Sequence, residues 1–139
     1  MSDDFHRNPY EGAAAVALAG MFKTDSRILA AYLHGSCVAG TERADSDLDC
    51  GLLLYPGFRI STLERMQMNG SASAQLHRQV DIGILSPVSL VYFIRAVAGG
   101  YCLYCANSGI RDLIVAHAFA DYAQLREDRR PVEEAYCAA

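Results

Sequence analysis

The chain has 139 residues, of which 52% are apolar and 20% charged, a composition typical of a globular protein rather than a disordered one. Its formal net charge of −4 and its single lysine, Lys23, argue against a broad basic surface for nucleic acid or anionic membranes. This length predicts one domain over residues 1–139, with a polar lead-in at 1–9 and a polar tail at 127–139.

The N-terminal segment is acidic and polar, whereas an export signal needs a basic stretch followed by an apolar run. No window approaches about eighteen uninterrupted apolar residues, so no membrane span is expected. Five cysteines at irregular spacing fit reduced thiols better than a disulfide framework. We therefore expect a cytoplasmic protein.

The first predicted helix is the alanine-rich stretch at 11–23, because alanine has the highest helix propensity. We expect its Val16, Leu18 and Phe22 to pack against a sheet. A short apolar run then predicts a buried strand at 28–33.

Two further strands are predicted at 47–55 and 79–85, each an apolar run that carries acidic residues near its start. The region between them, 59–78, is harder to interpret, because Asn69-Gly70 is a strong break signal inside a helical pattern. A broken helix, or a helix with a loop, is expected there. The apolar positions that would share one face of this helix are Leu63, Met66 and Leu76.

Serine and proline at 86–87 favour a helix start, and this helix is predicted at 88–97. An edge strand follows at 101–105, and a final helix is predicted from 108 to about 126. The positions of that last helix at roughly helical intervals are Ile110, Leu113, Ile114, His117 and Tyr122.

The most informative stretch is HGSCVAGTERADSDLDCGLLLY, residues 34–55. Gly35 and Ser36 suggest a turn, ten residues follow, and Asp47 and Asp49 then stand one residue apart at the head of an apolar run. A strand places residues i and i+2 on the same face, so the two carboxylates should point together. Paired carboxylates suit a divalent cation, and a Gly-Ser turn can offer backbone N–H groups to the phosphates that such a cation would bridge.

Gly-Ser, ten residues and Asp-x-Asp together resemble the motif of the polymerase-beta-like nucleotidyltransferase superfamily, and specifically its minimal nucleotidyltransferase (MNT) branch. The resemblance covers about residues 28–126 and implies an α+β fold in which helices pack on a small mixed sheet. It also implies a third carboxylate on a later strand, for which Asp81 in QVDIGIL is the candidate. Small proteins of this branch are commonly the antitoxin half of HEPN/MNT toxin–antitoxin pairs.

The resemblance implies an ATP- and Mg²⁺-dependent adenylyltransferase that modifies a tyrosine hydroxyl of a cognate HEPN ribonuclease toxin and so neutralises it. By the same resemblance, Asp47 and Asp49 would ligate two Mg²⁺ ions, and Asp81 would bind the ion nearer the acceptor. Gly35 and Ser36 would hold the outer phosphates. The toxin would be the partner, with no direct contact to nucleic acid or membrane.

One feature departs from this family. Many relatives carry an arginine between the Gly-Ser pair and the next glycine, whereas Cys37, Val38 and Ala39 precede Gly40 here. Either Arg43 supplies the missing positive charge from the loop, or nucleotide affinity is lower. This keeps open an antitoxin that acts by binding and occlusion. A separate alternative is a small-molecule nucleotidyltransferase acting on an antibiotic.

Single residues also have simpler interpretations. Asp81 could be a strand acid that faces solvent, and Ser36 could be only a turn residue. Cys102 and Cys105 form a CxxC, but no second pair completes a zinc site, and a strand should put the two thiols on opposite faces. Core packing is the interpretation we favour for them, and a structural role for His34.

Overall fold

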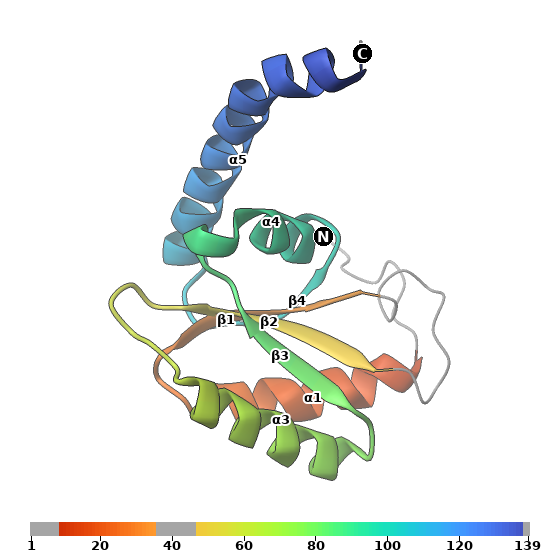
Figure 1. Cartoon of the computed structure of the whole chain (residues 1–139). Helices are drawn as coiled ribbons and strands as arrows, with labels where there is room; N and C mark the ends of the chain where they lie inside the picture. Colours follow the sequence, from red (N-terminus) through yellow and green to blue (C-terminus); the bar gives the residue numbers. More distant parts are fainter. Residues whose placement is uncertain (1–8, 36–46, 138–139) are drawn as a thin grey trace.

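The computed structural model describes residues 9–35 and 47–137, which form a four-stranded sheet with helices on both faces (Figure 1). The elements in chain order are α1 (Pro9–Lys23), β1 (Ile28–His34), β2 (Leu48–Leu54), α3 (Thr62–Leu76), β3 (Val80–Ile84), the 3₁₀ turn η1 (Pro87–Ser89), α4 (Leu90–Ala98), β4 (Tyr101–Cys105) and α5 (Ser108–Cys137). The strands lie in the order β3-β2-β1-β4. Because β1 is antiparallel to both β2 and β4 while β2 is parallel to β3, the sheet is mixed and the predicted α+β fold is confirmed.

The helices divide between the two faces of the sheet (Figure 1). Helices α1 and α3 cover one face, which we call the α1/α3 face, and α4 with the first part of α5 covers the other, the α4 face. Side chains alternate along β2, so Leu48, Cys50 and Leu52 pack toward α1 and α3 while Leu53 packs toward α4. Two cores therefore share the same strands.

The predicted packing faces of the first two helices are partly wrong. In α1, Leu18 and Phe22 are buried as expected, but Val16 is 74% exposed. Residues 18 and 22 are one helical turn apart, whereas position 16 lies about 200° around the helix from position 18. In α3, Leu63 and Met66 are also exposed, and the residues that pack are Met68, Ala72 and Leu76, again four apart.

Helix α3 is continuous through Asn69-Gly70, so the predicted break is wrong. A capping box starts the helix: the Ser61 hydroxyl accepts from the Glu64 N–H, and the Glu64 carboxylate accepts from the Ser61 N–H. Asn69 is engaged outside the helix, because its Oδ1 accepts a hydrogen bond from the Ile82 N–H at 2.8 Å. This long-range hydrogen bond overrides the local turn signal.

Helix α5 extends well beyond the predicted end near residue 126 and through Pro131 to Cys137, so the described part of the tail is helical. Proline removes one helical hydrogen bond, but neighbouring pairs such as Arg130 to Glu127 at 2.6 Å support these turns. Figure 1 shows the later turns projecting away from the sheet. Every residue from 126 to 137 is exposed.

The first part of α5 packs by a narrower stripe than predicted. Ile114 and Tyr122 contact the core on the α4 face, whereas Ile110, Leu113 and His117 are exposed. Across the ranges 9–35 and 47–137, no helix combines the length and hydrophobicity needed to cross a membrane.

Cys102 and Cys105 lie on the same side of β4, contrary to the prediction that the strand separates them. The register between β4 and β1 shifts, so Cys102 pairs with Tyr32 and Cys105 with Ala30. The extra residue in β4 interrupts the alternation of side chains between the two faces of the sheet, so residues i and i+3 lie on the same face. Both thiols are half-buried against the core and neither is in a disulfide, in agreement with a packing role.

Candidate active site

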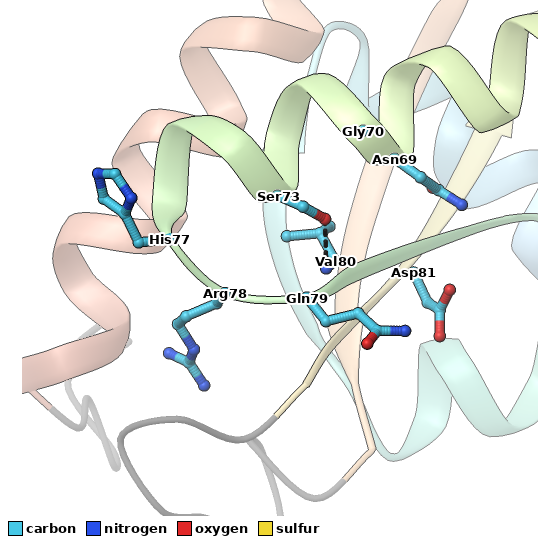
Figure 2. Close-up of a pocket in the computed structure, with 8 residues that line it drawn as sticks. All are labelled: Asn69, Gly70, Ser73, His77, Arg78, Gln79, Val80 and Asp81. Carbon is cyan, nitrogen blue, oxygen red and sulfur yellow. Dashed lines mark hydrogen bonds between the residues drawn. The ribbon is translucent and has the colours of Figure 1, made fainter.

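The predicted acidic residues lie at one end of the sheet, on its α4 face. Asp49 of β2 pairs in register with Asp81 of β3 and, on its other side, with His34 of β1. Residues paired across adjacent strands project to the same face, so these three side chains form a row. Asp47 stands immediately before β2 and is exposed. Figure 2 shows the exposed Asp81 side chain pointing away from α3, as this face requires.

Asp49 is the half-buried member of the acidic group. Burial raises the pKa of its carboxyl, the charge of His34 lowers it, and the charges of Asp81 and Asp47 raise it further. Its negative charge is therefore disfavoured by the protein alone, and a bound cation would relieve that cost. The row is electrostatically suited to receive positive charge.

Gly35 gives Asp49 the space that it occupies. Its φ angle is +83°, which residues with a side chain rarely adopt, and a Cβ at this position would lie 2.5 Å from Asp49 Oδ2. The turn after β1 and the second acid of the Asp-x-Asp motif are thus directly packed together. Ser36, Arg43 and the loop between them lie outside the described residues.

Tyr92 of α4 covers the row from the helical side. Its hydroxyl lies 3.1 Å from His34 Nε2, and the two rings meet edge to face with centroids 5.3 Å apart. A Cβ at Gly83 would collide with the same hydroxyl, so the glycine in β3 makes room for the tyrosine. Burial raises the pKa of Tyr92, and the charge of Asp49 adds to this effect.

The sequence-based prediction missed Tyr92 and assigned His34 only a structural role. A signal for the tyrosine was present at Gly83, because a glycine inside a strand often marks a close approach by another group. Nothing in the sequence identified which side chain would approach it.

The carboxylates fit a hard divalent cation by their chemistry. Within 9–35 and 47–137, no three side chains of the types His, Cys, Asp and Glu are placed close enough together to hold a metal ion. Asp49 and Asp81 are neighbours by register, whereas Asp47 is exposed at the strand end, where its side chain is not confined by packing. Like charges repel when no cation is present, so a gathered trio is not expected in the free protein.

A groove of about 590 Å³ runs beside Asp81 at the outer edge of the sheet (Figure 2). Most of its lining residues are polar, and they come from the second half of α3, the turn after it and the start of β3. The lining residues are Asn69, Gly70, Ser73, His77, Arg78, Gln79, Val80 and Asp81. An acceptor group could reach Asp81 from this side without crossing β2.

Comparison with known proteins gives one family match and several structural matches. Residues 17–109 match the family model described as "Polymerase beta, Nucleotidyltransferase". No curated protein matches the chain.

Several solved structures of toxin–antitoxin complexes have a similar fold. The crystal structure of a toxin–antitoxin with AMP-PNP matches with a TM-score of 0.73 and 20% identity, covering 90% of this chain and 97% of that one. A tri-AMPylated Shewanella oneidensis HEPN toxin in complex with MNT antitoxin matches with a TM-score of 0.73 and 16% identity, covering 91% and 98%. The toxin–antitoxin MntA-HepT gives 0.72 and 16%, with the same coverage. At these identities the likeness shows a common fold.

Proposed function

This chain belongs to the polymerase beta nucleotidyltransferase family, and from that premise we propose that it transfers AMP from ATP to a tyrosine hydroxyl of a cognate HEPN ribonuclease toxin. The modification would neutralise the toxin, which makes the chain an antitoxin. The observation that carries the proposal is the register of Asp49 with Asp81, with Gly35 packed against Asp49. The fold shared with MNT–HEPN complexes supports the choice of partner.

The proposed role of each acidic residue follows from its position in the row. Asp47 and Asp49 would hold two Mg²⁺ ions, with Asp81 as a further ligand of the one nearer the acceptor. When bound, Mg²⁺ would neutralise charge on the phosphate oxygens and favour the deprotonated acceptor. The Gly35 turn, together with Ser36, would hold the outer phosphates through backbone N–H groups and the serine hydroxyl.

Side chains of the protein would take the proton of the acceptor and support the acidic row. Asp81 is the outermost acid of the row and would accept the proton of the tyrosine hydroxyl. The tyrosine oxygen would then bond to the α-phosphorus, the bond from that phosphorus to the β-phosphate oxygen would break, and pyrophosphate would leave. His34 and Tyr92 would keep the inner end of the row in place through their mutual contact.

The open groove supports a protein acceptor. It lies along the outer edge of β3, which no other strand of the described sheet covers. A partner protein could cover the groove and exclude water from the reacting groups.

A second candidate is an antitoxin that neutralises its toxin by occlusion. It is favoured by the absence of the usual motif arginine from the Gly-Ser segment, which removes a positive charge from the expected phosphate site. The experiment below separates the two functions.

The test is to incubate the chain with ATP, Mg²⁺ and the product of the neighbouring gene, and to weigh the partner by intact mass spectrometry. An added AMP that disappears in the Asp47→Asn/Asp49→Asn variant is the expected result. A partner that stays unmodified but loses its ribonuclease activity would establish occlusion instead.

A further inference from the structure

The outer edge of β3 is hydrogen-bonded to side chains of α3, although no other strand pairs with it in the described sheet. Ser73 Oγ accepts from the Val80 N–H at 2.9 Å, and Asn69 Oδ1 accepts from the Ile82 N–H at 2.8 Å (Figure 2 draws the first). Arg65 Nη1 donates to the Ile82 carbonyl at 3.1 Å. Edge strands usually leave such groups to water or to an unwanted partner strand.

The spacing of these side chains matches the spacing of the strand. Residues 65, 69 and 73 are four apart and so lie along one stripe of the helix, about 6 Å from one to the next. Alternate residues of a strand are about 6.6 Å apart. A helix that runs antiparallel to β3 can therefore hydrogen-bond to successive outward-facing amides, as Ser73 and Asn69 do to Val80 and Ile82.

Asp81 lies between the two amides that α3 holds. On its inner side the strand is paired with β2, where Asp81 is in register with Asp49. On its outer side the flanking N–H groups of Val80 and Ile82 are held by α3. The backbone that carries this exposed carboxylate is thus held on both sides of the strand.

We propose that Asn69 and Ser73 are positioning residues for Asp81: they hold the outer side of β3, so that the Asp81 carboxylate stays aligned with Asp49. The inference rests on the proposed function, in which Asp81 binds the cation nearer the acceptor. Displacement of a catalytic group by about 1 Å can cost about 100-fold in rate, so an edge strand without such support would be a poor carrier for it.

The experiment compares Ser73→Ala, Asn69→Ala and the conservative Ser73→Thr, which keeps the hydroxyl. Ser71→Ala, on the exposed side of the same helix, is the control. Amide hydrogen exchange at Val80 and Ile82, kcat and KM for ATP, and Mn²⁺ affinity are measured at a temperature where melting curves show every variant folded. Asp81→Asn gives the reference effect on Mn²⁺ affinity.

Removing either side chain should speed exchange at the amide that it holds and lower kcat by about tenfold, in the range seen when residues supporting metal ligands are replaced. KM for ATP should change by less than about twofold, because binding of the nucleotide is assigned to the other end of the row. Ser73→Thr and Ser71→Ala should behave as the unmodified chain does. If one alanine variant fails to fold, the other carries the test.

Faster exchange with unchanged kcat and Mn²⁺ affinity would overturn the proposal, because the two side chains would then only protect the strand edge. Unchanged exchange would overturn it as well. If the unmodified chain transfers no AMP, the proposed function fails, and Mn²⁺ affinity decides the positioning role: Asn69→Ala must weaken it in the same direction as Asp81→Asn.

Discussion

The two faces of the sheet are built from the same strands and each packs on an apolar core, but only one of them carries the acidic row. On the α1/α3 face, β2 and β3 present apolar side chains, including the buried Leu48, Leu52 and Ile82. On the α4 face the same strands present Asp49 and Asp81. Because alternate residues face opposite ways, one strand register sets both the apolar core and the acidic row. Substitutions at neighbouring positions of one strand should therefore lower either the stability of the protein or its activity, depending on the face.

The largest effect is expected from Asp49→Asn. Transfer of AMP should fall more than about 100-fold, since even residues that only support metal ligands cost about 10–100-fold. The melting temperature should stay equal or rise, because burial and the neighbouring acids raise the pKa of Asp49 and so oppose its charge. Calorimetry and a transfer assay on the same preparation check both; a large drop in melting temperature would contradict the separation of the two faces.

Leu52→Ala, on the opposite face of the same strand, should have the reverse profile. Leu52 is fully buried, and truncation of such a leucine costs about 2–5 kcal/mol in the free energy of unfolding. Activity per folded molecule should be retained at a temperature well below the transition. Urea unfolding measures the loss, with Leu63→Ala as the control because Leu63 is 66% exposed.

Two glycine-to-alanine substitutions, at Gly83 in β3 and Gly70 in α3, should have opposite effects on stability. Gly83→Ala should destabilise by about 1–3 kcal/mol and reduce transfer, because the new methyl group would displace the Tyr92 hydroxyl from its place beside His34. Gly70→Ala, in α3, meets no atom within 4 Å and should stabilise by about 0.5–1 kcal/mol. Thermal unfolding of the two variants should move in opposite directions, and equal destabilisation would contradict this account.

The smallest effect concerns the ion pairs at the start of β1. Arg27 contacts Asp25 and Glu64, each at 2.8 Å, and its hydrogen bonds are the main cause that lowers the pKa of both carboxyls. A lowered pKa means that the stabilisation is present above the unfolded-state value near 4 and is lost as the pH falls through the folded-state value. Asp25→Asn should therefore lower the melting temperature by a few degrees at pH 7 and hardly at all near pH 3. AMP transfer at pH 7 should be unchanged.

The strands were predictable because their apolar runs are continuous and bounded by turn residues. The strands at 28–34 and 48–54 fall within about a residue of their predicted ranges. Helices cover both faces of the sheet at β1, so almost every residue of this strand is buried. Such a strand is a continuous apolar run, which is easily recognised in a sequence.

The contacts between distant segments could not be predicted in the same way. The continuity of α3 depends partly on Asn69 bonding to Ile82, and the common face of Cys102 and Cys105 depends on a register shift against β1. The helical continuation through Pro131 likewise runs against a strong local signal. In each case the observed structure differs from the one that the propensities of the individual residues favour.

For the candidate site, the sequence indicated the acids but not their surroundings. The Asp-x-Asp spacing led to Asp47 and Asp49, and Asp81 followed from the family resemblance. The pairing of Asp81 with Asp49, and the approach of Tyr92 to His34, depend on strand order and on the docking of α4. Side-chain pairs of this kind are set by the tertiary fold.

The most direct test of the central claim is a double-mutant cycle on Mn²⁺ binding, followed by electron paramagnetic resonance. It compares the unmodified chain with Asp49→Asn, Asp81→Asn and the double variant. If the two carboxylates share a cation, each single substitution should weaken binding, and the double variant should lose less free energy of binding than the sum of the two losses. Unchanged Mn²⁺ affinity in Asp81→Asn, or strictly additive losses, would contradict a shared site.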